Sequence, residues 1–156
     1  MDIEKIKLFR EKLRQLERAM GSQFKNDSDC CGVTLSQCHA LLEVEEKGEI
    51  SIVELASKLG LDTSTLSRTI NGLVLIGLIN RIENSKDRRY VSITLTEQGK
   101  KVYEDIENLN NGYFSKIFEL IPEEKHEAIL ESVSLFSDAV KKFIERSQCC
   151  KEENHS

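Results

Sequence analysis

The chain has 156 residues, of which 39% are hydrophobic and 31% are charged, and its formal net charge is -5. A chain of this size and composition can bury the core of one globular domain without covalent staples. No apolar run approaches the ~20 residues needed to span a bilayer, and the charged N-terminus lacks the apolar core of a signal peptide. We therefore expect a cytoplasmic protein that has no membrane partner.

The N-terminal segment predicts an amphipathic helix, because its apolar residues recur at helical spacing. These residues are Ile6, Phe9, Leu13, Leu16 and Met20. Residues 21–29 (GSQFKNDSD) are rich in poor helix formers and predict a break. A second helix is expected after Thr34, because Thr34 and Gln37 form a capping-box pattern. Its apolar residues continue to Val44, and we expect it to end near Gly48.

Two short helices joined by a glycine-containing turn follow, which is the pattern of a helix-turn-helix motif. The first is predicted to begin at Ser51, where Glu54 completes a second capping box, and to end at Gly60, a residue suited to a left-handed C-cap. The second is predicted to begin after Asp62 as its N-cap. Its predicted apolar stripe is Leu66, Ile70, Leu73, Val74 and Gly77.

A β-hairpin is predicted directly after this motif. Residues 78–83 are expected to form its first strand, and residues 84–87 are turn-rich. Residues 90–95 alternate between two faces and are β-branched, so they are expected to return as the partner strand. Thr96 is expected to cap a further helix. A hairpin in this position is a candidate wing.

The C-terminal part predicts a helix that packs against another helix. Pro122 suits the first turn, where its missing backbone donor is not needed. The apolar residues then follow a 4-3-4-3 spacing at Ile129, Val133, Phe136, Val140 and Phe143. Together with the N-terminal stripe, this is more apolar surface than a monomer of this size covers easily. We therefore expect a dimer.

The charge distribution favours a nucleic-acid partner despite the negative total. Between Lys58 and Lys101 there are eight basic and four acidic residues, a local net charge of +4 that leaves -9 for the rest of the chain. A basic segment inside an acidic chain is typical of a module that binds DNA. We expect residues 50–96 to bind duplex DNA.

The second helix of the motif carries the candidate contacts to the major groove. Short hydroxyl side chains allow a helix to enter the groove closely, and Arg68 can bond guanine O6 and N7. Asn71 could bond adenine or a phosphate. The alternative is an ordinary exposed helix face, since serine and threonine are common on any surface. The candidates on this helix are Thr63, Ser64, Thr65, Ser67, Arg68 and Asn71.

The predicted hairpin tip adds three cations and one acid: Lys86, Asp87, Arg88 and Arg89. An arginine on a thin β-tip can enter the narrow minor groove, where the negative potential is strongest. Asp87 lies two residues before Arg89 and could hold its guanidinium in a bidentate pair. A solvated charged turn is the alternative, but the adjacent helix-turn-helix favours the DNA contact.

The segment from Leu55 to Gly99 contains SKLGLDTSTLSRTINGLVLIGLINR and then SKDRRYVSITLTEQG. It resembles the MarR family of winged-helix regulators. The family's Asp-x-Arg wing signature falls on Asp87 and Arg89, and its closing Leu-Thr-x-x-Gly falls on residues 95–99. The helix before this segment and the long terminal helices also agree, so the resemblance covers nearly the whole chain.

The resemblance implies a mainly α fold with a small β-wing. It implies a winged helix-turn-helix domain at 34–99, a helical dimerisation region formed by 1–33 and 100–148, and a tail at 149–156. It further implies a homodimer that binds a pseudo-palindromic operator in double-stranded DNA, usually as a repressor. By this match Arg89 is the minor-groove arginine and Asp87 its support, and the major-groove face is formed by Ser64, Thr65, Ser67 and Arg68.

The five cysteines suggest a thiol-based signal: Cys30, Cys31, Cys38, Cys149 and Cys150. They have polar neighbours, and in a reducing cytosol they should be thiols. The first pair could fold back onto Cys38, and several thiolates suit a soft ion such as As(III), cadmium, mercury or Cu(I). His39 and Glu43 could instead complete a harder, zinc-like site with Cys38. By analogy with the family's intertwined dimer, the C-terminal pair could complete the site of the partner subunit.

Two other signals remain open, because members of this family commonly respond to small molecules, oxidants or metal ions. The same thiols fit redox or electrophile sensing, since a thiolate near a helix N-terminus is reactive. Cys38 could also be a small buried core residue, which would leave a regulator of an apolar ligand. DNA binding itself requires no cofactor in any of these versions.

The sequence does not predict an enzyme. It lacks a glycine-rich phosphate loop, a nucleophile elbow, paired catalytic carboxylates and the CxxC of thiol oxidoreductases. A winged helix that binds only proteins is the other rival, and the cation-rich wing argues against it. His126 and His155 have no partner at ligand spacing, so we expect both at the surface.

Overall fold

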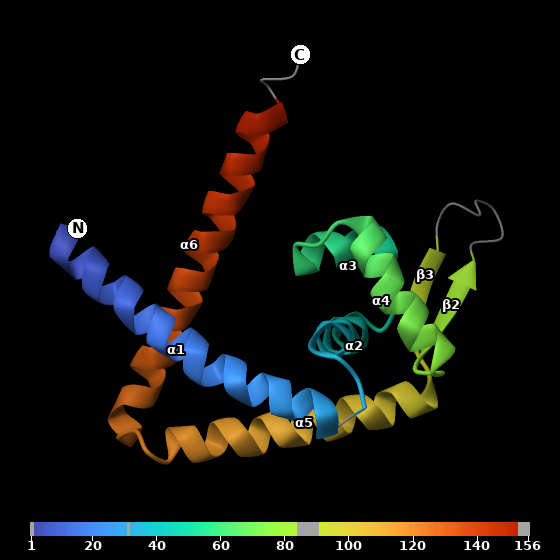
Figure 1. Cartoon of the computed structure of the whole chain (residues 1–156), viewed down its shortest axis with the longest axis horizontal. Coiled ribbons are helices and arrows are strands. Elements are labelled where there is room, and N and C mark those ends of the chain that lie inside the picture. The colour runs from blue at the N-terminus through green and yellow to red at the C-terminus, as the bar shows by residue number, and fades with distance from the viewer. Residues whose placement is uncertain (1, 31, 84–90, 153–156) are drawn as a thin grey trace. The chain divides into compact units, whose positions relative to one another are not determined.

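The computed structural model describes the backbone of residues 2–30, 32–83 and 91–152, and their side chains except at 22–30, 83, 145 and 148–152. Residues 1–109 and 110–156 form two compact units. The first unit contains a mainly helical fold with a small antiparallel sheet (Figure 1). Among the described residues, no helix is long and apolar enough to cross a membrane. The predicted domain boundaries at residues 33, 99 and 148 stay a prediction.

The first helix, α1, is longer than the sequence predicts and runs from Ile3 to Cys30. The expected break at residues 21–29 is wrong. One interior glycine weakens a helix by only about 1 kcal/mol, and the segment has no proline to remove a backbone hydrogen bond. The chain turns instead at Gly32, whose φ of 68° lies in the left-handed region that glycine adopts freely.

The next helix, α2 (Leu35–Lys47), confirms the predicted capping box. The Thr34 hydroxyl accepts a hydrogen bond from the Gln37 backbone amide at 3.3 Å, and the Gln37 side-chain oxygen accepts one from the Thr34 amide at 2.8 Å. Two otherwise unsatisfied donors at the helix start are thereby paired. The helix ends at Gly48, as predicted.

The helix-turn-helix is confirmed as α3 (Ile52–Leu59) and α4 (Thr63–Leu75). Ser51 and Glu54 form the expected capping box of α3. Gly60 ends α3 with φ 64° and ψ 29°, a left-handed C-cap. Asp62 caps α4, and its carboxylate accepts from the Thr65 amide at 2.8 Å. The end of α4 was predicted too late, because Gly77 lies beyond Leu75 in the turn that follows.

The sheet has three antiparallel strands in the order β1-β3-β2. The predicted hairpin strands are β2 (Ile79–Glu83) and β3 (Val91–Leu95), with Ile79 opposite Leu95. Strand β1 (Ile50–Ser51) was not predicted, because two residues carry no periodic signal. Strand β1 pairs with β3 and is followed directly by α3, so this pairing fixes the start of α3 to the hairpin.

One core lies within the winged-helix part of the first unit and includes the predicted stripes of α2, α3 and α4. Its buried members are Val33, Ala40, Leu41, Val44, Ile50, Leu55, Ala56, Leu66, Ile70, Leu73, Leu78, Ile79, Ile93, Leu95 and Ile106. Figure 1 shows α3 and α4 against each other, with the hairpin beside α4. The core therefore holds α4 and the hairpin as one rigid body.

The base of the hairpin is tied to the start of α5 (Glu97–Phe118). The Thr96 amide donates to the Leu78 carbonyl at 3.0 Å, and its hydroxyl donates to the Gly77 carbonyl at 2.7 Å. The same hydroxyl accepts from the Gly99 amide at 2.9 Å, which confirms the predicted cap. Gly99 packs so closely on Leu78 that a Cβ atom would overlap the Leu78 carbonyl oxygen.

Gly99→Ala is therefore expected to destabilise the protein by about 3 kcal/mol, because the obstructing atom is backbone and cannot rotate away. The measurement is the free energy of unfolding by urea denaturation. Gly112→Ala in the same helix is the matched control, since a Cβ there meets no atom within 4 Å. The control should be neutral or stabilising by roughly 0.5–1 kcal/mol. Equal stabilities for both variants would contradict the close approach at Gly99.

The second unit contains the end of α5, the short 3-10 helix η1 (Glu123–Lys125) and α6 (His126–Glu152). His126 was expected at the surface, but it is half-buried in the turn between the two long helices. Its Nε2 lies 3.1 Å from the Phe118 carbonyl and 3.0 Å from the Ile121 carbonyl. Since both neighbours are acceptors, Nε2 must carry a proton, and the ring stabilises the corner by donating to the end of α5.

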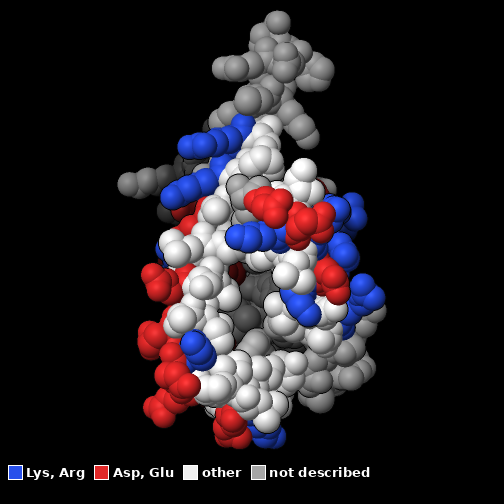
Figure 2. Space-filling model, turned by 90° about the vertical axis from the view of Figure 1, so that its left-hand side faces the viewer, with Lys and Arg blue, Asp and Glu red and all other residues white. Residues whose placement is uncertain are grey.

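The apolar stripes predicted at the chain ends lie on α1 and α6 and are exposed. On α1 the exposed fractions are 43% for Phe9 and 55% for Leu16, and on α6 they are 63% for Val133 and 72% for Phe143. Figure 2 shows uncharged side chains lying among acidic and basic clusters on one face of the molecule. Large apolar side chains of both stripes are therefore accessible to a partner within the part of the chain that the structure describes.

Candidate nucleic-acid interface

The outer face of α4 carries a row of exposed polar side chains. Ser64, Arg68 and Asn71 are all exposed. At 3.6 residues per turn, these positions fall within about 60° of one another around the helix axis. Thr63 and Thr65 are also exposed beside this row, while Leu66, Ile70 and Leu73 face the core. The helix therefore presents one face to the core and the opposite one to solvent.

Two of the serine hydroxyls use their protons within α4. The Ser64 hydroxyl donates to the Asp62 carboxylate at 2.5 Å, and the half-buried Ser67 hydroxyl donates to the Thr63 carbonyl at 2.7 Å. Each hydroxyl then has only lone pairs left for another molecule. In this arrangement both are suited to accept from the amino groups of adenine or cytosine in the major groove.

The N-terminus of α4 is already occupied by its own carboxylate. Hydrogen bonds from the Ser64 hydroxyl, and then from Thr65, hold the pKa of Asp62 well below its ordinary value. Asp62 therefore stays negative at any pH at which the protein is used. The negative charge of Asp62 would repel a phosphate from this helix end. Any phosphate contact is therefore expected from longer side chains farther along α4.

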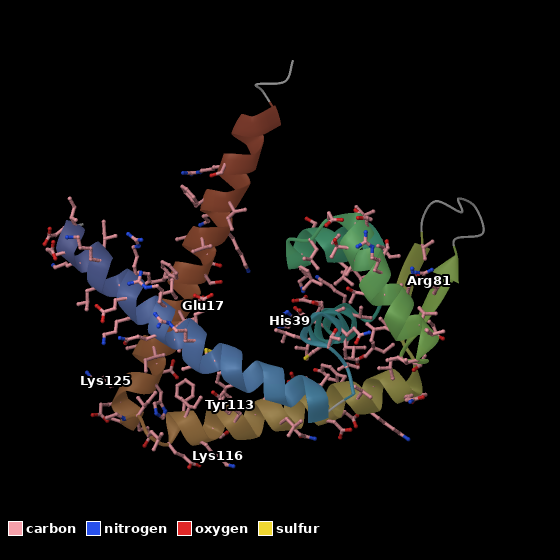
Figure 3. All side chains as sticks on the ribbon, viewed as in Figure 1. Glu17, His39, Arg81, Tyr113, Lys116 and Lys125 are labelled. Carbon is pink, nitrogen blue, oxygen red and sulfur yellow. The ribbon has the colours of Figure 1, made fainter. Side chains whose placement is uncertain are left out.

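Arg81 joins the outer face of α4, although the sequence alone does not predict it as a site residue. Figure 3 shows Arg81 on the hairpin beside α4. Its Nη2 donates a short hydrogen bond to the Asn71 side-chain oxygen. Asn71 was predicted to bond DNA directly, but its oxygen is already an acceptor for Arg81. Residues two apart in a strand point to the same face of the sheet, and Ile79 is buried. The position of Arg81, two residues after Ile79, therefore indicated a side chain directed toward α4.

The predicted wing-tip residues Lys86, Asp87, Arg88 and Arg89 lie outside the described residues. Their assignment to the minor groove stays a prediction. The paired strands β2 and β3 are in place on either side of them, and the last described pair is Glu83 opposite Val91. The hairpin that would carry a wing is therefore confirmed.

An ion cluster holds α3 against α2. Lys58 on α3 forms ion pairs with Glu43 and Glu46 on α2, the second at 2.6 Å. Hydrogen bonds to Glu43 and then Glu46 raise the pKa of Lys58, and the same contact with Lys58 lowers the pKa of Glu46. Glu43 of the predicted harder site with Cys38 and His39 is thus ion-paired with Lys58, and that site stays a prediction. His39 lies on the exposed side of α2 (Figure 3).

The structure describes one of the five cysteine side chains. Cys38 is half-buried on α2 and packs against the winged-helix core. Cys30 is the last residue of α1, and Cys149 and Cys150 belong to the last turns of α6, but only their backbones are described. Cys31 lies outside the described residues. The side chains that are described include no group of three histidine, cysteine or acidic residues that could hold a metal ion.

Known proteins resemble this chain in sequence and in fold. The model of the MarR family matches residues 33–91. The HTH-type transcriptional regulator YpoP of Bacillus subtilis (strain 168) is 30% identical over 99 residues, which are 64% of this chain and 68% of that protein. The organic hydroperoxide resistance transcriptional regulator of the same bacterium is 34% identical over 82 residues, 53% of this chain and 56% of that protein.

The likeness in fold extends over most of the chain. The crystal structure of Streptococcus pneumoniae FabT in complex with DNA matches with a TM-score of 0.75 and 15% identity, covering 86% of this chain and 99% of that one. An exposed polar face on the second helix of the motif, a hairpin beside it and this agreement in sequence and fold lead to one conclusion. The chain belongs to the MarR family of DNA-binding transcriptional regulators.

Proposed function

We propose that this regulator is a homodimeric repressor, that it binds a pseudo-palindromic operator, and that a thiol-directed signal releases it. The observation that carries the DNA-binding part is the outer face of α4, where Ser64, Arg68 and Asn71 form one exposed row. Each subunit would insert its α4 into the major groove of one half-site. Two half-sites about one helical turn apart would then match the two-fold axis of the dimer.

The exposed stripes on α1 and α6 support the dimer. Large apolar side chains with more than a third of their surface exposed recur along both helices, among them Leu13, Leu16, Val133 and Phe143. Contiguous apolar surface of this kind marks interaction sites in proteins that are otherwise soluble. A second copy of the chain is the partner that fits, because helices with 4-3-4-3 apolar spacing pack on one another.

Release would begin at the cysteines, with a soft metal or metalloid as the first candidate. Cys38 lies one turn into α2, and its backbone amide donates to the Thr34 carbonyl at 2.8 Å. Cys30 ends α1, two residues before the turn at Gly32. Thiolates that meet near this turn would suit As(III), Cd, Hg or Cu(I). Cys149 and Cys150 would join them from the partner subunit.

The path from the cysteines to DNA would run through α2. Next to Cys38, Gln37 packs on α4 so closely that a Cβ atom added at Gly72 would lie 2.9 Å from its side-chain nitrogen. A ligand that shifts α2 would therefore shift α4. Because the half-sites are fixed in the operator, a few ångströms of mismatch between the two α4 helices would prevent both from docking together.

A redox signal is the second candidate, and the relative named for organic hydroperoxide resistance favours it. In that case an organic hydroperoxide would transfer one oxygen to a cysteine thiolate, giving a sulfenate and the corresponding alcohol. A thiolate near the N-terminus of α2 would be the target, because the helix dipole stabilises its charge.

The test is a titration of the protein–operator complex with As(III), Cd, Hg, Cu(I), Zn and cumene hydroperoxide, with thiols counted at each point. We expect stoichiometric release by a soft ion, and Cys30→Ser or Cys31→Ser should block release while operator affinity without effector is unchanged. Ser36→Ala, an exposed position on α2, is the matched control and should be released normally. Release of a variant that lacks all five cysteines would disprove the thiol signal. Release by the hydroperoxide alone would select the redox version.

A further inference from the structure

The hydrogen bond between Arg81 and Asn71 joins the hairpin to the outer face of α4. We propose that Arg81 is a further DNA contact that binds a backbone phosphate, and that Asn71 is its positioning residue and makes no base contact. The proposal rests on the entry of α4 into the major groove, as proposed above. It adds a cation on β2 to the interface and gives Asn71 a different role from the one predicted from sequence.

The strand register places Arg81 beside α4. Arg81 lies opposite Ile93, and paired residues of antiparallel strands point to the same face of the sheet. Ile93 is fully buried in the core on that face. Arg81 shares the face but is exposed, so its long side chain reaches past the edge of the core. Its guanidinium then meets Asn71 on the solvent side of α4.

The partner of Arg81 leaves its charge available. Asn71 is a neutral amide, and it accepts a bond from one of the five guanidinium N–H groups. No described carboxylate lies within ion-pair distance of Arg81. By contrast, Lys58 on α3 is paired with two carboxylates. Among the described side chains, Arg81 is therefore a cation that a neutral partner orients and that faces no carboxylate, on the surface proposed to meet DNA.

The position along α4 favours a phosphate over a base. In helix-turn-helix proteins the N-terminal residues of the second helix contact base edges. Asn71 lies seven residues after Ser64, roughly 10 Å farther along the helix axis. At that distance from its N-terminus, a helix inserted in the major groove would lie beside the sugar-phosphate backbone and no longer over the base edges. The flat guanidinium with parallel N–H groups fits phosphate oxygens there.

The test is a double-mutant cycle of wild type, Asn71→Ala, Arg81→Ala and the double variant. Affinity is measured between 0.05 and 0.3 M salt (about 8–10 Å screening lengths near the middle of the range) on two ~30-base-pair duplexes. One duplex is selected by the wild-type protein from a random pool, and the other is an unrelated sequence. Lys116→Ala on α5 is the charge control, because it removes one exposed cation in the second unit.

Arg81→Ala is expected to weaken binding to both duplexes by about 30-fold near 0.15 M salt and to reduce the salt slope by about 1.8, the loss of one phosphate contact from each subunit of the proposed dimer. Arg81→Lys should recover most of the slope. Asn71→Ala should have a smaller effect that disappears when Arg81 is also alanine, because Asn71 acts only through Arg81. The melting temperature of each variant is measured as well. A variant that loses its fold would melt at a lower temperature, whereas the predicted effect changes the salt slope and leaves the melting temperature unchanged.

Unchanged affinity and slope in Arg81→Ala, with normal binding by the wild type, would overturn the inference and leave the proposed function intact. An Asn71→Ala effect of the same size with and without Arg81 would also overturn it, and would restore Asn71 as a direct DNA contact. If the wild-type protein enriches no sequence from the random pool and binds no duplex, the proposed function fails, and this inference fails with it.

Discussion

Val133→Glu on α6 is expected to convert the proposed dimer into monomers and to lower operator affinity by at least about 100-fold. Val133 is 63% exposed in the isolated chain and lies on the stripe proposed to face the partner subunit. A carboxylate there would be buried without a partner in the dimer, which is strongly unfavourable. A monomer would also lose the gain from engaging two half-sites at once, which is worth roughly 10²–10⁴ in affinity.

Sedimentation equilibrium measures the association, and a duplex titration measures operator affinity. Leu135→Glu is the matched control, because Leu135 is equally exposed at 64% but lies off the 4-3-4-3 stripe. It should leave the dimer intact. A Val133→Glu protein that remains dimeric and binds the operator normally would contradict the proposed seam.

Arg68→Ala is expected to weaken operator binding by at least about 30-fold, because one base contact is lost in each half-site, while changing affinity for unrelated DNA far less. Arg68 is exposed on the outer face of α4, and no described side chain pairs with it. A bidentate contact to guanine O6 and N7 accounts for about 1–3 kcal/mol of discrimination. The loss should therefore concentrate at one base pair of each half-site.

Selection of binding sites by wild type and Arg68→Ala would show this as relaxed preference at a single position. Arg68→Lys separates the two possible roles, since a lysine keeps the charge and loses the planar fork. If both duplexes lose affinity equally and the site preference is unchanged, Arg68 binds a phosphate and the predicted base contact is wrong.

The starts of α2, α3 and α4 were predictable because their signals are local. Each boundary depends on side chains a few residues apart, such as Thr34 with Gln37, Ser51 with Glu54 and Asp62 with Thr65. Capping of this kind is encoded within one turn of helix. The hairpin was equally accessible, because alternating β-branched residues predict a strand wherever they occur.

The remaining features depend on residues far apart in sequence. Strand β1 exists only because Ile50 pairs with Ile93, and Arg81 reaches Asn71 only in the observed register. His126 bonds to carbonyls of Phe118 and Ile121, which come together beside it only because the chain turns where α5 ends. At α1, the weak helix formers in residues 21–29 predict a break that the structure lacks, because propensity alone rarely interrupts a helix without proline.

The unbroken α1 changes how a signal at Cys30 would travel. A helix of 28 residues is a stiff rod about 42 Å long, and Phe9 and Cys30 are parts of the same rod. If residues 21–29 were a flexible segment, a ligand could bring Cys30 toward Cys38 without moving the rest of α1. With a rod, pulling the Cys30 end toward Cys38 acts as a lever on the stripe at the other end. In the proposed dimer, sensing and subunit geometry would then be a single mechanical event.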